Sequence, residues 1–167
     1  MSERPLRNVL FLCTGNSARS VLSEAYLNAK GAGRFRAFSA GSHPSGRVHP
    51  LTLETLAAGG LATEGYRSKS WNEFAAPGAP AMDFVITVCD SAAGEVCPIW
   101  PAQPITAHWS FSDPAAFEGT EDEKRAFFRE IFSQIRSRID LLLSLPVQRL
   151  DRIALKKRVD EIGYSGV

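Results

Sequence analysis

Short apolar runs alternate along the chain with segments whose apolar residues recur every three or four positions. The runs are typical of buried strands and the periodic segments of helices with one buried face. We expect strands at 9–12, 35–40, 83–89 and 104–109, and helices at about 18–29, 49–58, 121–143 and 149–162. This alternation predicts an α/β fold with a parallel sheet and helices on both faces.

Composition narrows the class of protein further. The chain has 167 residues, 44% of them hydrophobic and 22% charged, which is typical of one globular domain spanning 1–167. A net charge of +1 gives no reason to expect nucleic acid or a membrane as partner. No apolar run has the length of a membrane span, and residues 1–8 lack the pattern of a secretory signal. We therefore expect a cytosolic protein whose three cysteines are reduced, metal-bound or redox-active, not structurally bridged.

The first strand leads into Cys13-Thr14-Gly15-Asn16-Ser17-Ala18-Arg19-Ser20, and a helix follows. Unpaired amide groups and the helix dipole at such a junction bind anions. Gly15 permits a positive φ angle, and Asn16 tolerates one and can brace the loop. Arg19 can place a planar fork of donors on two ligand oxygens. The loop therefore predicts a site for a tetrahedral oxyanion, at the strand ends where such sheets bind ligands.

Cys13 is the candidate nucleophile of this site. A cysteine at a helix N-terminus that faces an arginine is expected to have a lowered pKa, and the thiolate is the reactive form. Ser20 can donate a hydrogen bond to the sulfur. A buried strand-end cysteine beside an ordinary glycine turn is the alternative, and the contiguous loop argues against it.

These residues resemble the signature of the low-molecular-weight protein tyrosine phosphatase superfamily, which includes thioredoxin-coupled arsenate reductases. The resemblance extends to Phe38-Ser39-Ala40-Gly41, Ser68-Lys69-Ser70, the strand before Cys89, and Asp113-Pro114. It implies a flavodoxin-like three-layer sandwich with a four-stranded parallel sheet and helices on both faces, with Cys13 as nucleophile and Asp113 as general acid. By itself, an Asp-Pro pair is more often a simple turn.

The other two cysteines bear on the type of reaction. Cys89 ends a strand and Cys97 follows eight residues later, a separation longer than in typical three-cysteine arsenate reductases. The resemblance implies that Cys89 attacks the Cys13 adduct, releasing arsenite, and that Cys97 then attacks Cys89. Alternatively, Cys89 packs at the strand end and Cys97 has no role.

Some of these reductases bind potassium through the loop asparagine, a serine and an acid. Asn16 and Ser39 match the first two, whereas Lys69 stands where the acid is expected. A lysine ammonium can replace the ion, so we expect no metal and no potassium requirement. Lys69 as an ordinary solvated charge is equally compatible with the sequence. The three histidines lack metal-ligand spacing, and we assign His108, His43 and His49 no catalytic role.

Ala18 stands where phosphatases often carry a second cysteine, and Ala115-Ala116-Phe117 replaces their tyrosines. We therefore favour arsenate reductase over phosphatase. A non-catalytic oxyanion- or partner-binding module is the third hypothesis, but it needs neither thiol nor acid. No cofactor is expected beyond an external reductant such as thioredoxin, a glutaredoxin or a small thiol. We expect a monomer or weak dimer.

Overall fold

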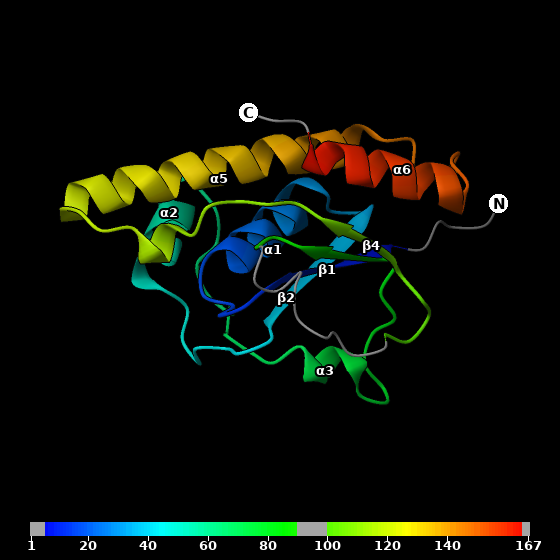
Figure 1. Ribbon diagram of the computed structural model, residues 1–167, viewed down its shortest axis with the longest axis horizontal. Coiled ribbons are helices and arrows are strands. Elements are labelled where there is room, and N and C mark those ends of the chain that lie inside the picture. Colours follow the sequence, from blue (N-terminus) through cyan, green and yellow to red (C-terminus); the bar gives the residue numbers. More distant parts are fainter. Residues whose placement is uncertain (1–5, 90–99, 165–167) are drawn as a thin grey trace.

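Four parallel strands form the central sheet of the computed structural model, which describes residues 6–89 and 100–164 (Figure 1). The strands are β1 (Arg7–Cys13), β2 (Phe35–Gly41), β3 (Phe84–Thr87) and β4 (Ile105–His108), in the order β2-β1-β3-β4. The predicted four-stranded parallel sheet is confirmed, although β3 ends two residues before the expected limit at Cys89.

Helices follow the predicted order, with one addition. They are α1 (Arg19–Lys30), α2 (Pro50–Ala58), α3 (Asn72–Ala75), α5 (Glu121–Ser144) and α6 (Arg152–Gly163), with a 3-10 turn η1 (Pro114–Ala116). The short helix α3 was not predicted, because a single turn of four residues gives no apolar periodicity to detect.

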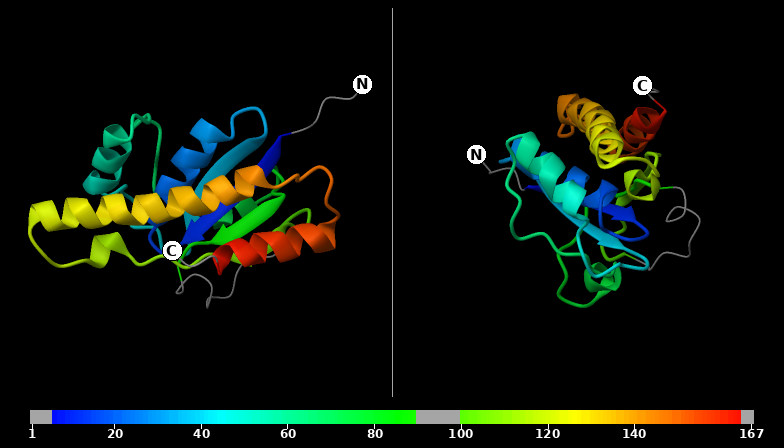
Figure 2. Two further views of the ribbon diagram at one scale, coloured as in Figure 1. Left: turned by 90° about the horizontal axis from the view of Figure 1, so that it is seen from above. Right: turned by 90° about the vertical axis from the view of Figure 1, so that its left-hand side faces the viewer.

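The sheet is buried on both faces. Val9 and Phe11 of β1 face a core shared with α1, α5 and α6, whereas Leu10 and Leu12 face Trp71 and its neighbours. The right-hand view in Figure 2 shows α5 and α6 together over one face of the sheet and α3 at the other. This arrangement is the expected three-layer sandwich, and it explains why β1 is continuously apolar.

The strand order places Cys13 at a topological switch point. From β1 the chain crosses to β2 on one side, while β3 lies on the other, so a crevice opens at the carboxyl end of β1. Val88 continues the pairing beyond β3, since its N–H donates to Leu12 O at 2.8 Å. Cys89 therefore follows directly at the same edge of the sheet as Cys13.

The C-terminal helix anchors the strand that leads to Asp113. Trp109 is buried, and its indole Nε1–H donates to Val159 O on α6 at 3.0 Å. The Lys156 ammonium donates to Thr106 O on the outer edge of β4. In the described part of the chain, no helix has the length and apolar character to cross a bilayer.

Candidate active site

The carbonyl groups of the loop after Cys13 are hydrogen-bonded away from its interior. Thr14 O accepts from His43 N at 2.9 Å, and Gly15 O accepts from Ser45 N at 3.0 Å. Ser17 O accepts from both His49 N and Thr52 Oγ1. Because C=O and N–H point in opposite directions across a trans peptide, these anchors turn the following amides inward. This arrangement leaves the loop amides available to an anion, as the predicted oxyanion site requires.

Two donors contact the Cys13 sulfur directly. Asn16 N–H donates to it at 3.3 Å, and Ser20 Oγ lies 2.9 Å away. Ala18, the residue that caps α1, makes no side-chain capping bond. The first amides of α1 therefore stay available for an anion beside the sulfur.

Asn16, not Gly15, is the residue with the left-handed backbone in this loop. Its φ is 48°, whereas Gly15 has no positive φ, so the expectation for Gly15 is wrong. The close backbone approach occurs instead at Gly41, where an added Cβ would overlap Thr14 O and lie 3.1 Å from Asn16 Cβ. The sequence suggested no such role for Gly41, because the contact depends on how β2 pairs with β1.

A directed hydrogen-bond network supports the loop. Lys69 N–H donates to Asn16 Oδ1 at 2.9 Å, which fixes the orientation of the amide. Asn16 Nδ2 then donates to both Ser20 Oγ at 2.8 Å and Ser39 Oγ at 3.0 Å. Ser39 in turn donates to Glu24 Oε1. The loop-bracing contacts of Asn16, Ser39 and Lys69 are therefore present, with Lys69 acting through its backbone.

The predicted lowering of the Cys13 pKa is wrong. Burial of the sulfur raises the pKa of the Cys13 thiol above its ordinary value, and the nearby Cys89 adds to the rise. Hydrogen bonds from Ser20 and the charge of Arg19 lower it, but by less. The sequence motif suggested the favourable charges, whereas the cost of removing the sulfur from water depends on the packing around it.

Arg19 connects the oxyanion loop to the loop that carries Asp113. Arg19 Nη1 donates to Phe111 O at 3.0 Å, and Nη2 lies 3.5 Å from Asp113 Oδ2. Asp113 Oδ1 accepts from Ala115 N, so the carboxylate caps η1 while its side chain stays 40% exposed. Arg19 keeps further N–H donors for ligand oxygens. The structure therefore brings nucleophile, cation and candidate acid together.

Cys89 lies next to the loop. Its buried sulfur is 3.6 Å from Thr14 Oγ1, and neither Cys13 nor Cys89 is in a disulfide. Cys97 lies outside the described residues. His108 has a structural contact, since its Nδ1 lies 2.7 Å from Thr87 Oγ1 on the neighbouring strand.

The Lys69 ammonium lies near a buried carboxyl without forming an ion pair with it. Lys69 Nζ donates to Arg67 O at 3.0 Å. Burial lowers the pKa of Lys69 and raises that of Glu24, and the charge of each opposes the shift of the other. Sequence reasoning missed Glu24, although its position four residues after Ser20 places both on one face of α1.

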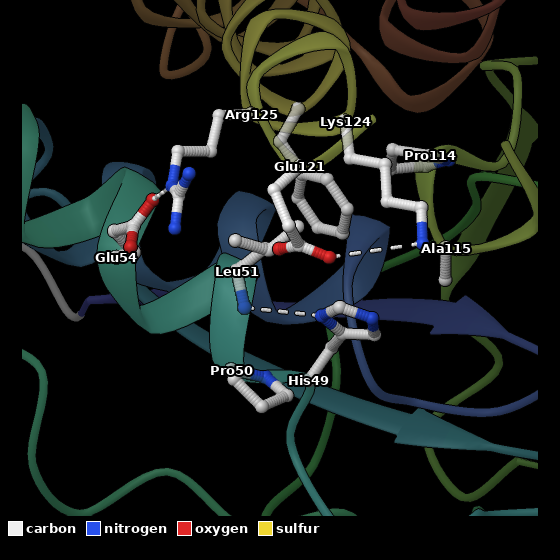
Figure 3. Close-up of a pocket in the computed structure, with 10 residues that line it drawn as sticks. His49, Pro50, Leu51, Glu54, Pro114, Ala115, Glu121, Lys124 and Arg125 are labelled. Atoms are coloured by element: carbon white, nitrogen blue, oxygen red, sulfur yellow. Dashed lines mark hydrogen bonds and ion pairs between the residues drawn. The ribbon is translucent and has the colours of Figure 1, made fainter. Parts of the chain in front are cut away.

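A hollow of about 380 Å³ borders the Asp113 loop (Figure 3). Its walls come from the start of α2, from η1 and from the start of α5, and Phe128 forms part of it. His49 lies at the edge, where its ring contacts Phe128 and its Nδ1 accepts from Leu51 N, as Figure 3 shows. Burial lowers the pKa of His49, and the charge of Asp113 opposes this. His49 is therefore the helix-start residue expected, and its N–H donates to Ser17 O at 3.0 Å.

Among residues 6–89 and 100–164, no group of three His, Cys, Asp or Glu side chains is arranged to hold a metal ion. The oxygens that match the potassium ligands each have a hydrogen-bond partner within the protein, because Asn16 Oδ1 accepts from Lys69 N–H and Ser39 Oγ donates to Glu24.

Fold and site together define an α/β protein with a buried thiol beneath an oxyanion-binding loop. Residues 8–158 match the model of the low molecular weight phosphotyrosine protein phosphatase family. The chain belongs to this family.

Similar proteins within the family include several arsenate reductases. The arsenate reductase of Bacillus licheniformis is 35% identical over 134 residues, which are 80% of this chain and 92% of the relative. A solved arsenate reductase in the phosphate binding state has a TM-score of 0.67 at 29% identity, covering 83% of this chain and 98% of that one. A thioredoxin-dependent arsenate reductase of Corynebacterium glutamicum has a TM-score of 0.55 at 26% identity, covering 83% and 64%.

Proposed function

We propose that this protein reduces arsenate to arsenite through a relay of Cys13, Cys89 and Cys97. The observation that carries the proposal is the position of Cys89, whose buried sulfur lies 3.6 Å from Thr14 Oγ1 of the oxyanion loop. Hydrolysis of a phosphoenzyme by water needs no second thiol at this place. The similarity to arsenate reductases supports the same reading.

In the first step, the Cys13 sulfur forms a bond to arsenic while an arsenate oxygen leaves as water, with a proton from Asp113. Arg19 and the loop amides stabilise the negative charge on the remaining oxygens. Because burial raises the pKa of Cys13, the hydrogen bond from Ser20 matters for holding the thiolate during attack.

In the second step, the Cys89 thiolate attacks the Cys13 sulfur. A Cys13–Cys89 disulfide forms, and the electron pair of the broken sulfur–arsenic bond stays on arsenic, which leaves as arsenite. Cys97 then attacks Cys89, so that Cys13 leaves as a thiolate and a Cys89–Cys97 disulfide remains. An external dithiol of the thioredoxin type reduces that disulfide, which restores three thiols and balances the two electrons given to arsenic.

The expected setting is the cytosol, where a thiol reductant is available. We also propose that the enzyme needs no resident metal or potassium, because the Lys69 ammonium supplies positive charge near Glu24. Equal turnover in potassium and sodium buffers is the expected result, and activation by potassium would contradict it.

The test of function is arsenate-dependent oxidation of reduced thioredoxin by the wild type, Cys89→Ser and Cys97→Ser. We expect turnover by the wild type and no turnover by either variant. In both variants, arsenate should still consume the Cys13 thiol once per enzyme molecule. Normal turnover by both variants would exclude the relay. Hydrolysis of p-nitrophenyl phosphate without arsenate reduction would favour the phosphatase alternative, for which the exposed Asp113 beside Arg19 is suited.

A further inference from the structure

Arg138 is a buried arginine whose contacts lead to the loop of the candidate acid. It lies on α5, which runs above the segment between β4 and η1 (Figure 1). Only 8% of the residue is exposed. Its Nη1 donates to Ser110 O at 3.1 Å, and its guanidinium carbon lies 4.8 Å from the centre of the Phe111 ring.

Among the described residues, no carboxylate forms an ion pair with this cation. Within the same part of the chain, the buried Nε of Arg138 has no hydrogen-bond partner. Burial alone lowers the pKa of Arg138, yet an arginine stays charged at neutral pH. An uncompensated buried charge costs stability, so a residue that served only packing would be better replaced by an apolar one.

Phe111 is held from two sides by two arginines. Arg138 contacts its ring, and Arg19 Nη1 donates to its carbonyl oxygen at 3.0 Å. Asp113 follows two residues later, with Oδ2 at 3.5 Å from Arg19 Nη2. A shift of Phe111 would therefore move the carbonyl that orients Arg19 and the backbone that carries Asp113.

We propose that Arg138 is a positioning residue of the active site, which holds Ser110 and Phe111 so that Arg19 and Asp113 face the oxyanion above Cys13. This inference rests on the roles given to Arg19 and Asp113 in the proposed function. Arg138 itself touches neither the thiol nor the ligand.

The first test compares Arg138→Met with Arg136→Met. Arg136 is a matched control, because it lies on the same helix with its guanidinium carbon 4.8 Å from the Phe132 ring and has no contact with the Asp113 loop. The readout is the phosphate concentration that protects Cys13 from alkylation by iodoacetamide. We expect Arg138→Met to weaken phosphate binding about tenfold, the size of one hydrogen bond to a charged group, with no effect of Arg136→Met. Arg138→Lys, which keeps charge and one donor, should restore part of the affinity.

A second readout separates positioning from general destabilisation. Hydrolysis of aryl phosphates with poor leaving groups needs the acid, whereas good leaving groups do not. We expect Arg138→Met to slow poor leaving groups more than good ones, while its melting temperature stays at or above that of Arg136→Met. A phosphate affinity of Arg138→Met within twofold of the wild type would overturn the inference. An equal decrease in hydrolysis rate for all leaving groups would also overturn it.

These measurements do not depend on arsenate reduction. A wild type that binds phosphate at Cys13 but leaves thioredoxin reduced would refute the proposed function and leave the inference standing. If Arg138→Met does not fold, the test rests on Arg138→Lys. Weaker phosphate binding by Arg138→Lys at an unchanged melting temperature supports the positioning role, and phosphate affinity equal to that of the wild type refutes it.

Discussion

The amide of Asn16 donates to the hydroxyl oxygen of Ser20 at 2.8 Å. Because the oxygen of Ser20 accepts this bond, its hydroxyl hydrogen is free to point at the Cys13 sulfur 2.9 Å away. The orientation of the network, which begins at Lys69 N–H, therefore favours the thiolate form of Cys13, although burial has the larger effect and raises the pKa of the thiol.

Replacing Ser20 by alanine should raise the pKa of Cys13 further, since the largest influence that lowers it is lost. At neutral pH the thiolate fraction falls tenfold for each unit of pKa, so we expect alkylation of Cys13 to slow about tenfold. Rates of iodoacetamide reaction across pH measure this shift. Ser23→Ala is the control, because its buried hydroxyl donates to Arg19 O and contacts no thiol. An unchanged pH profile in Ser20→Ala would contradict the assignment.

Gly41→Ala should distort the oxyanion loop, because the new Cβ would overlap Thr14 O. We expect a loss of about 1–3 kcal/mol in the free energy of unfolding, together with weaker phosphate protection of Cys13. Urea unfolding and alkylation measure the two effects. Gly59→Ala is the matched substitution, since its Cβ would lie 3.4 Å from the Phe132 ring and far from the loop in sequence. Equal changes in unfolding free energy and in phosphate protection for Gly41→Ala and Gly59→Ala would refute the close approach at Gly41.

Asp113→Asn should slow hydrolysis of aryl phosphates with poor leaving groups roughly a hundredfold or more, because proton donation is lost. Good leaving groups should be affected much less. The Asn side chain can still accept from Ala115 N, so the cap of η1 is retained and the melting temperature should change little. An equal decrease in hydrolysis rate for good and poor leaving groups would show that Asp113 has only a structural role.

The buried carboxyl of Glu24 should make stability depend on pH. Burial raises the pKa of Glu24 above 4.5, so the folded state binds the proton more tightly than the unfolded state. Its contribution to stability is therefore largest below pH 4.5 and decreases as pH rises through the folded pKa. Glu24→Gln, which can still accept from Ser39, should flatten this decrease in chemical unfolding measured from acidic to neutral pH. Glu130→Gln, at an exposed position of α5, should keep the wild-type slope.

Local sequence was sufficient for the order of strands and helices. The apolar run before Cys13 and the periodic segments of α1 and α5 reflect burial on both faces of a strand and on one face of a helix. The contiguous loop from Cys13 to Ser20 also indicated its chemistry, because inward amides and the helix start follow from local backbone geometry.

Only the tertiary structure decided the pKa of Cys13, the close approach of Gly41, and the contacts of Arg138 with Ser110 and Phe111. These depend on residues that are distant in sequence and meet through the sheet order and the path of α5. The candidate nucleophile and its oxyanion loop could thus be predicted from the sequence. The desolvation of the Cys13 sulfur and the support of the loop that carries Asp113 depend on packing.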